Sequence, residues 1–292
     1  MYRLICLNII CLIIAAPIIA VAANTEGKIN VFVSILPQKY LVERIGGNRV
    51  DVSVMVKPGL SPETYEPTPK QMAALNTARI YFRIAVPFET VWIKRIKDLN
   101  PQIRIIECCG DLNITDPAHQ DHGKFNTRYV NDAHVWTSPE NAIVLAGIIK
   151  SVLSEYDPGS AEYYSANYNI LVNDLGALDA FIRNELAGIK NRYFIVSHPS
   201  WGYFAEAYGL EQISIEQHGT EVRAKKLSRL IEFARQREIH TVFVQKQFNT
   251  ASAKTLAREI NGKIVELDPL AEDYINNLGY VARAIADGAR QK

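Results

Sequence analysis

Apolar side chains recur along residues 157–190 at steps of three and four positions, which predicts one long α-helix. Asp157 and Pro158 suit its start as cap and first helical residue, and Gly188 with Lys190 suits its end. A helix of this length spans roughly 45 Å, so we expect it to pack lengthwise against the rest of the chain. We call it the spine helix. The recurring positions are Tyr164, Tyr168, Leu171, Leu175, Leu178 and Ile182.

On both sides of the spine helix, short β-branched runs alternate with helical patterns. The runs that predict strands are Ile29–Ile35, Val50–Val56, Arg79–Ala85, Gln102–Glu107, Arg192–Ser197, Leu210–Ile215, Thr241–Val244 and Lys263–Leu267. This alternation predicts two α/β lobes with mainly parallel sheets flanked by helices. The N-terminal lobe is expected over residues 24–156 and the C-terminal lobe over 191–292. Ligands of such folds bind beyond the carboxyl ends of the strands and between lobes.

Residues 1–23 have the pattern of a signal peptide. Arg3 precedes the apolar run Leu4–Val21, and small residues at its end suit cleavage. A membrane anchor is the alternative, because the run approaches the length that spans a bilayer. Cys6 and Cys11 lack the neighbouring small residues that lipid attachment needs. We therefore expect an exported, periplasmic protein without a lipid anchor.

Charge and cysteine content narrow the range of partners. Residues 1–23 hold one basic residue and no acidic one, so the 32 Lys+Arg and 31 Asp+Glu of the whole chain become 31 and 31. A net charge near zero gives no reason to expect nucleic acid or an anionic membrane as a partner. We also expect the protein to be a monomer. Cys108 and Cys109 are adjacent, which favours two free thiols over a strained bridge between neighbours. A two-cysteine metal site is disfavoured, since ligand pairs normally have residues between them.

Potential metal ligands follow predicted strands in both lobes. His198 and Asp268 come directly after two strands of the C-terminal lobe. In the N-terminal lobe, Glu63 lies in the loop after the second strand, and His134 ends an irregular segment after the fourth. Two imidazoles and two carboxylates form a mixed N/O set that suits zinc or manganese. Each residue also has an ordinary interpretation, as a buried histidine, a turn or a surface acid, so the hypothesis requires all four to meet between the lobes.

A set of motifs, in the same order along the chain, resembles a known family. The motifs are Val33–Pro37, Val56–Pro69, Ala133–Asn141, His198–Leu210, Ile215–Glu216 and Leu267–Leu270. They are similar to the metal-binding solute-binding proteins of bacterial zinc and manganese ABC importers, the ZnuA and TroA type. The resemblance spans essentially the whole chain after residues 1–23 and implies two α/β lobes bridged by one long helix. It also implies that His134, His198 and Asp268 are metal ligands.

The chain departs from the family pattern at the first ligand. The family usually has a histidine after Ser-Pro or Asp-Pro in the loop that here contains Ser61, Pro62 and Glu63. Glu63 therefore replaces the expected histidine. We favour a direct or water-mediated contact between Glu63 and the metal. A site of three protein ligands and a water is the alternative.

The remaining histidines have weaker claims to the metal. His119 and His122 correspond to the histidine-rich loop that zinc importers of the family often carry, and they either collect metal or are incidental residues of a solvated loop. His218 is expected in a loop that faces the cleft between the lobes, where it would be a reserve ligand. His240 follows a predicted helix and suits a packing or end-charge role.

These observations lead to one main functional hypothesis and two rivals. The main one is a periplasmic receptor that captures Zn²⁺, with Mn²⁺ as the alternative, and passes it to an importer permease in the inner membrane with its ATPase. It requires no catalysis. A metal-dependent hydrolase using the same ligands is a rival, although the sequence has no His-Glu-x-x-His and no Gly-x-Ser-x-Gly motif. A metal chaperone or adhesin on the same fold is the second rival.

Overall fold

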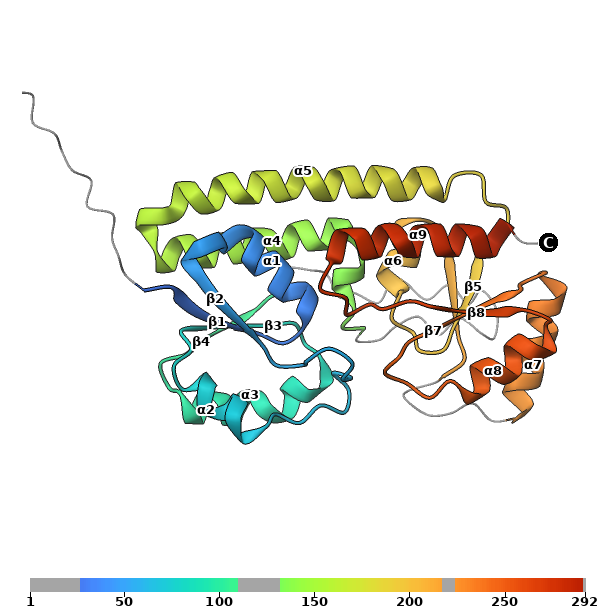
Figure 1. The fold of residues 1–292 in the computed structure, drawn as a ribbon, viewed down its shortest axis with the longest axis horizontal. Helices are drawn as coiled ribbons and strands as arrows, with labels where there is room; N and C mark the ends of the chain where they lie inside the picture. Colours follow the sequence, from blue (N-terminus) through green and yellow to red (C-terminus); the bar gives the residue numbers. More distant parts are fainter. Residues whose placement is uncertain (1–26, 110–131, 217–223, 291–292) are drawn as a thin grey trace, which may run out of the picture.

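The computed structural model describes residues 27–109, 132–216 and 224–290. Two four-stranded parallel sheets lie end to end, helices flank each of them, and one long helix runs across both (Figure 1). The predicted two-lobed α/β architecture with a spine helix is confirmed. Among the described helices, none is both long enough and apolar enough to span a membrane.

The N-terminal lobe has the strand order β2-β1-β3-β4, with every pair parallel. The central strands are almost fully buried, while the edge strands β2 and β4 are partly exposed. The burial of the central strands agrees with their sequences, because a parallel strand covered on both faces has a nearly continuous run of apolar residues. The elements of this lobe are β1 (Ile29–Val33), α1 (Leu36–Gly46), β2 (Val50–Val54), α2 (Pro69–Leu75), β3 (Ile80–Arg83), α3 (Pro87–Leu99), β4 (Arg104–Glu107) and α4 (Pro139–Tyr156).

The C-terminal lobe repeats this topology with the order β6-β5-β7-β8. In both lobes the strand order reverses next to the first strand of the sheet, which is where open α/β sheets bind their ligands. All eight predicted strands are present, within three residues of their predicted ends. The elements are β5 (Tyr193–Val196), α6 (Gly202–Ala207), β6 (Glu211–Ser214), α7 (Ala224–Gln236), β7 (Thr241–Val244), α8 (Ala251–Glu259), β8 (Lys263–Glu266) and α9 (Tyr274–Arg290).

The spine helix is α5 (Ala161–Glu185), shorter at both ends than the sequence predicts. Pro158 begins a separate 3₁₀ turn rather than the α-helix, and the Asp157 side chain caps no backbone N–H group. The expected capping by Asp157 is therefore wrong. Its carboxylate instead accepts a hydrogen bond from the hydroxyl of Tyr164 at 2.9 Å. Gly188, beyond the helix, adopts φ 75°, the left-handed conformation that suits a glycine after a helix end.

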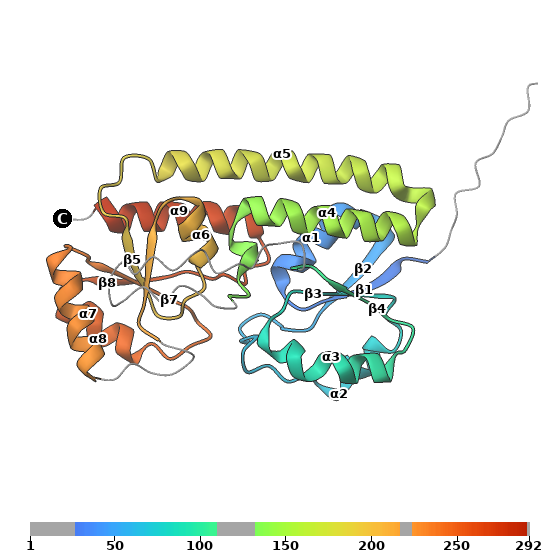
Figure 2. The ribbon, with the colours of Figure 1, turned by 180° about the vertical axis from the view of Figure 1, so that it is seen from behind.

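The apolar face of α5 contacts helices of both lobes. It packs against α1 and α4 of the N-terminal lobe and against α9 of the C-terminal lobe (Figures 1 and 2). Five of the six predicted positions are buried, and Tyr168 is half-buried with the ammonium group of Lys150 over its ring. The spine helix therefore contributes apolar surface to both lobes, and its stability comes from this packing rather than from intrinsic propensity.

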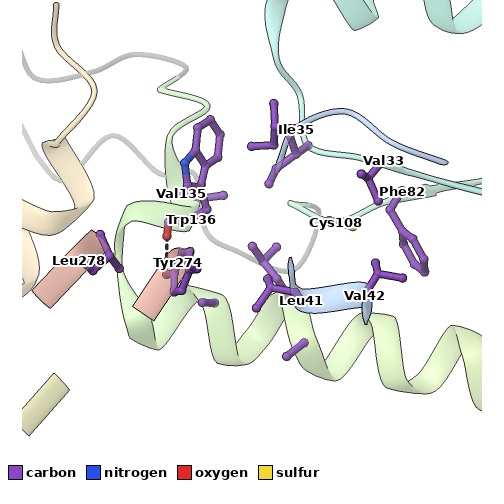
Figure 3. Close-up of a cluster of buried hydrophobic side chains, with 14 of the residues drawn as sticks. Val33, Ile35, Leu41, Val42, Phe82, Cys108, Val135, Trp136, Tyr274 and Leu278 are labelled. Atoms are coloured by element: carbon purple, nitrogen blue, oxygen red, sulfur yellow. Dashed lines mark hydrogen bonds between the residues drawn. The ribbon is translucent and has the colours of Figure 1, made fainter. Parts of the chain in front are cut away.

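One hydrophobic core extends from the N-terminal sheet through α4 and α5 to α9 and β5. A smaller second cluster lies beneath α7 and α8. Figure 3 shows the junction of the lobes, where the Tyr274 hydroxyl donates a hydrogen bond to the backbone carbonyl of Trp136 at 2.6 Å. The indole Nε1 of Trp136 donates in turn to the carbonyl of Pro269 at 2.7 Å. Buried contacts thus join the segment after His134 to the segment after Asp268.

Cys108 and Cys109 lie at the end of β4 as free, buried thiols, as the sequence predicts. Burial raises the pKa of Cys109 to about 12. Neither thiol is therefore a ready nucleophile or metal ligand at neutral pH.

Substituting Leu175 tests the packing of the spine helix. Leu175 is 0% exposed, whereas Ile170 on the same helix is 55% exposed. Leu175→Ala is expected to lower the free energy of unfolding by about 2–5 kcal/mol, because it removes buried methyl groups and leaves a cavity. Ile170→Ala is the control and should change it by less than about 0.5 kcal/mol. Denaturant unfolding measures both values, and equal losses would contradict this account of the helix.

Candidate metal centre

The strand register of the C-terminal sheet brings His198 beside Glu216. β5 and β6 pair in parallel from Tyr193 with Glu211 to Val196 with Ser214. Two residues further along each strand, the imidazole Nδ1 of His198 lies 3.0 Å from a carboxylate oxygen of Glu216. His198 is 4% exposed. The carboxyl end of this sheet therefore holds a buried carboxylate–imidazole pair.

Glu63 reaches the same histidine from the N-terminal lobe. Its Oε1 lies 2.9 Å from Nε2 of His198. The loop that carries it is fixed at two points: the Glu63 N–H donates to Oγ of Ser61 at 3.2 Å, and the Phe88 N–H donates to the carbonyl of Pro62 at 3.3 Å. The structure thus joins Glu63 and His198, two of the predicted ligands, across the boundary between the lobes.

His198 is enclosed on its ring face as well as at both nitrogens. The Phe248 ring, in the loop after β7, stacks on the imidazole at a centroid distance of 4.0 Å and an angle of 10°. Burial alone would lower the pKa of His198, but its hydrogen bonds to Glu216 and Glu63 outweigh this and raise the pKa to about 9. Burial would likewise raise the pKa of Glu63, yet its bond with His198 holds that pKa below its ordinary value. Without metal, the pair is therefore an ion pair at neutral pH.

His134 lies next to His198 and has a carboxylate partner of its own. The two imidazole centroids are 5.7 Å apart. Nδ1 of His134 lies 2.6 Å from Oδ1 of Asp132, and the same oxygen accepts the backbone N–H of His134 at 2.9 Å. His134 is half-buried, and Asp132 is buried with 7% exposure. The third predicted ligand thus lies with the first two.

Asp268 follows β8 and borders the space between the lobes. Its Oδ1 accepts the backbone N–H of Leu270 at 2.9 Å and the side-chain amide of Gln247 at 3.3 Å. It lines a cavity of about 170 Å³, together with Lys57 and Pro58 of the N-terminal lobe. No contact joins Asp268 to the two imidazoles among the described interactions.

The four predicted ligands do not form a finished coordination sphere. Within residues 27–109, 132–216 and 224–290, no group of three or more His, Cys, Asp or Glu side chains is placed to hold a metal ion. Glu63 contacts His198 and His134 lies beside it, whereas no described contact joins Asp268 to these three. Coordination by all four residues stays a prediction.

Two carboxylates next to the histidines received no role from the sequence. Glu216 is the last residue of the motif Ile215–Glu216, and Asp132 directly precedes the motif Ala133–Asn141. Strand register could have identified Glu216, since counting past the ends of β5 and β6 aligns it with His198. An Asp two residues before a His also has the spacing of a local turn in which a carboxylate accepts a backbone N–H.

The other histidines do not add to this cluster. His119, His122 and His218 lie outside the described residues. His240 is half-buried, and its Nδ1 lies 3.1 Å from the carbonyl oxygen of Ile260 at the end of α8. That contact fits the predicted packing role.

A family model and a solved structure that match this chain both belong to the same family. The model of the family described as zinc-uptake complex component A, periplasmic (ZnuA) matches residues 31–288. A crystal structure of a ZnuA deletion mutant with zinc bound is similar to the chain with a TM-score of 0.83 at 37% sequence identity. The similarity covers 91% of this chain and 99% of that one.

Two bacterial proteins are also similar to the chain. A putative metal-binding protein of Chlamydia muridarum is 31% identical over 263 residues, which cover 88% of this chain and 91% of that protein. The zinc-binding lipoprotein AdcA of Streptococcus pneumoniae is 27% identical over 256 residues. The match covers 85% of this chain but only 51% of AdcA, so the chain spans about half the length of that relative.

The raised pKa of His198 predicts how stability depends on pH when metal is removed with a chelator. Because the folded-state pKa of His198 lies above the ordinary 6.5, the protonated imidazole stabilises the fold. This contribution is complete below about pH 6.5 and is lost as the pH rises through about 9. The shift sets an upper limit of about 3 kcal/mol, at about 1.4 kcal/mol per pKa unit. Urea unfolding between about pH 6.5 and 9.5 measures the loss.

Two variants isolate the contribution of His198. His198→Ala should flatten the pH dependence in this window, whereas His240→Ala should keep it, because the contact of His240 is to a backbone carbonyl. A slope in His198→Ala equal to that of the unsubstituted chain would contradict the assignment.

Proposed function

The chain belongs to the family of periplasmic zinc-uptake components, and from this premise we propose that it captures a divalent metal ion and delivers it to an ABC-type importer. The cation is cargo: it is bound, carried and released unchanged. We propose that the protein acts outside the cytoplasm as a monomer, without a lipid anchor, and that its partners are the importer permease and its ATPase. No catalytic step enters this account.

One observation supports the proposal most directly. Glu63 of the N-terminal lobe contacts Nε2 of His198 at 2.9 Å, and the imidazole of His134 lies 5.7 Å from that of His198 by ring centroids. A cation that displaced the proton on Nε2 would therefore have donors from both lobes within reach. The surrounding carboxylates would compensate its charge in a partly buried site, where an unpaired charge is costly.

We propose His134, His198, Glu63 and Asp268 as the ligands. Glu63 contacts His198, His134 lies beside His198, and Asp268 lines a cavity bordered by residues of both lobes. For Asp268 to act as a ligand, its carboxylate would have to give up its hydrogen bond with Gln247 or bind through its other oxygen. The bond from Gln247 is long at 3.3 Å and therefore weak, whereas the bond from the Leu270 N–H to the same oxygen is 2.9 Å.

Zinc is the proposed physiological cargo, with manganese as its competitor. The family and the zinc-bound relative favour zinc. The donor set is less decisive, because imidazole suits zinc whereas carboxylates also suit manganese. Glu63, in the position where the family usually has histidine, is the residue on which the choice depends.

Alanine substitution of the two histidines tests the site. His134→Ala or His198→Ala is expected to lower zinc affinity by more than the roughly 10- to 100-fold that loss of a ligand's outer partner costs. His240→Ala is the matched control, and its affinity should stay unchanged. Isothermal titration of metal-stripped protein measures all three. Unchanged zinc binding in both site variants would exclude this centre.

Exchange of Glu63 tests the choice of metal. Glu63→His replaces a carboxylate with a third imidazole, so zinc affinity should rise relative to manganese affinity. Glu66→His places the same substitution on an exposed residue three positions further along the loop. It should leave the ratio of the two affinities unchanged. An unchanged ratio in Glu63→His would show that Glu63 does not contact the metal.

A further inference from the structure

Both histidines of the proposed centre are held at the same ring nitrogen. Nδ1 of His134 faces Asp132 at 2.6 Å, and Nδ1 of His198 faces Glu216 at 3.0 Å. The two carboxylates come from different lobes, and each lies in the same lobe as its histidine. Each lobe therefore has its own carboxylate–imidazole pair.

A carboxylate at Nδ1 determines which nitrogen is available to a metal. A neutral imidazole has one N–H and one lone pair, and an ionised carboxylate can only accept a hydrogen bond. The N–H must then be at Nδ1, which leaves the lone pair at Nε2. We propose that Asp132 and Glu216 are positioning residues that fix the tautomer and ring orientation of His134 and His198, so that both present Nε2 to one cation. This inference rests on the proposed function.

The surroundings of Asp132 suit a positioning role. Its Oδ1 also accepts the backbone N–H of His134, which fixes the carboxylate relative to the histidine. Its backbone carbonyl accepts a hydrogen bond from the Tyr203 hydroxyl of α6 at 3.3 Å. The segment that carries His134 is thereby attached to the C-terminal lobe as well.

Glu216 is held by the sheet that carries His198. Its backbone N–H donates to the carbonyl of Ser197 at 3.0 Å, which continues the pairing of β5 and β6. Its own carbonyl accepts the hydroxyl of Ser214 at 2.8 Å. With Phe248 also stacked on the face of the ring, the His198 imidazole has little freedom to rotate. Its orientation is set before a metal arrives, which lowers the entropy cost of binding.

A second observation concerns the negative charge of Asp132. Its other carboxylate oxygen, Oδ2, is buried and has no hydrogen-bond partner among the described residues. Such an oxygen is costly to bury unless a nearby positive charge compensates it. A metal ion on the far side of the His134 ring would supply that charge through the imidazole.

Four variants test the inference with Zn²⁺ as the probe. Asp132→Ala and Glu216→Ala remove the partner, whereas Asp132→Asn and Glu216→Gln keep an oxygen that can accept the Nδ1–H. Competition with a chromophoric chelator should show zinc affinity lower by roughly 10- to 100-fold in the alanine variants and partly restored in the amide variants. Glu155→Gln is the control: it removes an exposed carboxylate that pairs with Arg104, and it should bind zinc normally.

A second measurement separates positioning from general destabilisation. Co²⁺ substituted at saturation reports ligand number and geometry through its visible absorption, which a change in stability alone would not alter. The spectrum should change in the alanine variants and recover toward that of the unsubstituted chain in the amide variants. If an alanine variant does not fold, its amide counterpart decides the matter through the same spectrum and affinity.

The outcomes distinguish this inference from the proposed function. If His134→Ala and His198→Ala lose zinc binding while the Asp132 and Glu216 variants keep both affinity and spectrum, the positioning role is wrong and the metal centre stands. If zinc binding survives all of these substitutions, the proposed centre fails as well. A loss in Glu216→Ala as large as that in His198→Ala, with no recovery in Glu216→Gln, would make Glu216 a ligand instead.

Discussion

His198 lies between two carboxylates, Glu216 behind it in its own lobe and Glu63 in front of it in the other. The imidazole is almost fully buried, so each contact is made at low dielectric and is stronger than it would be in water. The contact with Glu63 joins the lobes, and the contact with Glu216 sets the ring. Under the proposed function, a divalent cation would replace the proton between Glu63 and His198, where two carboxylates already favour positive charge.

The architecture keeps this arrangement in place over long distances along the chain. The spine helix packs against helices of both lobes, and one hydrophobic core runs beneath it from sheet to sheet. The hydrogen bonds of Trp136 to Pro269 and of Tyr274 to Trp136 join the segments that lead from His134 and Asp268. The relative position of the lobes therefore rests on buried packing.

Sequence patterns predicted most of the fold and part of the centre. Short β-branched, apolar runs located the strands of the described residues, and apolar periodicity located the spine helix, because burial leaves a signal in the residue types of each element. It misplaced the start of the spine helix, because a hydrogen bond from Tyr164 engages Asp157 and no local pattern reports that contact. The resemblance supplied His134, His198 and Asp268, whereas Glu216 acquires its role only through strand register. The orientation of Asp268 depends on its contact with Gln247, which periodicity does not encode.

The central claim is that one cation lies between the lobes and is bound by an imidazole from each side of the cluster. Anomalous diffraction at the zinc edge, from crystals of the zinc-loaded protein, tests it most directly. The account predicts a single strong peak bonded to Nε2 of His134 and Nε2 of His198, each at about 2.0–2.1 Å. A zinc peak elsewhere, or one bonded through Nδ1 of either histidine, would contradict it.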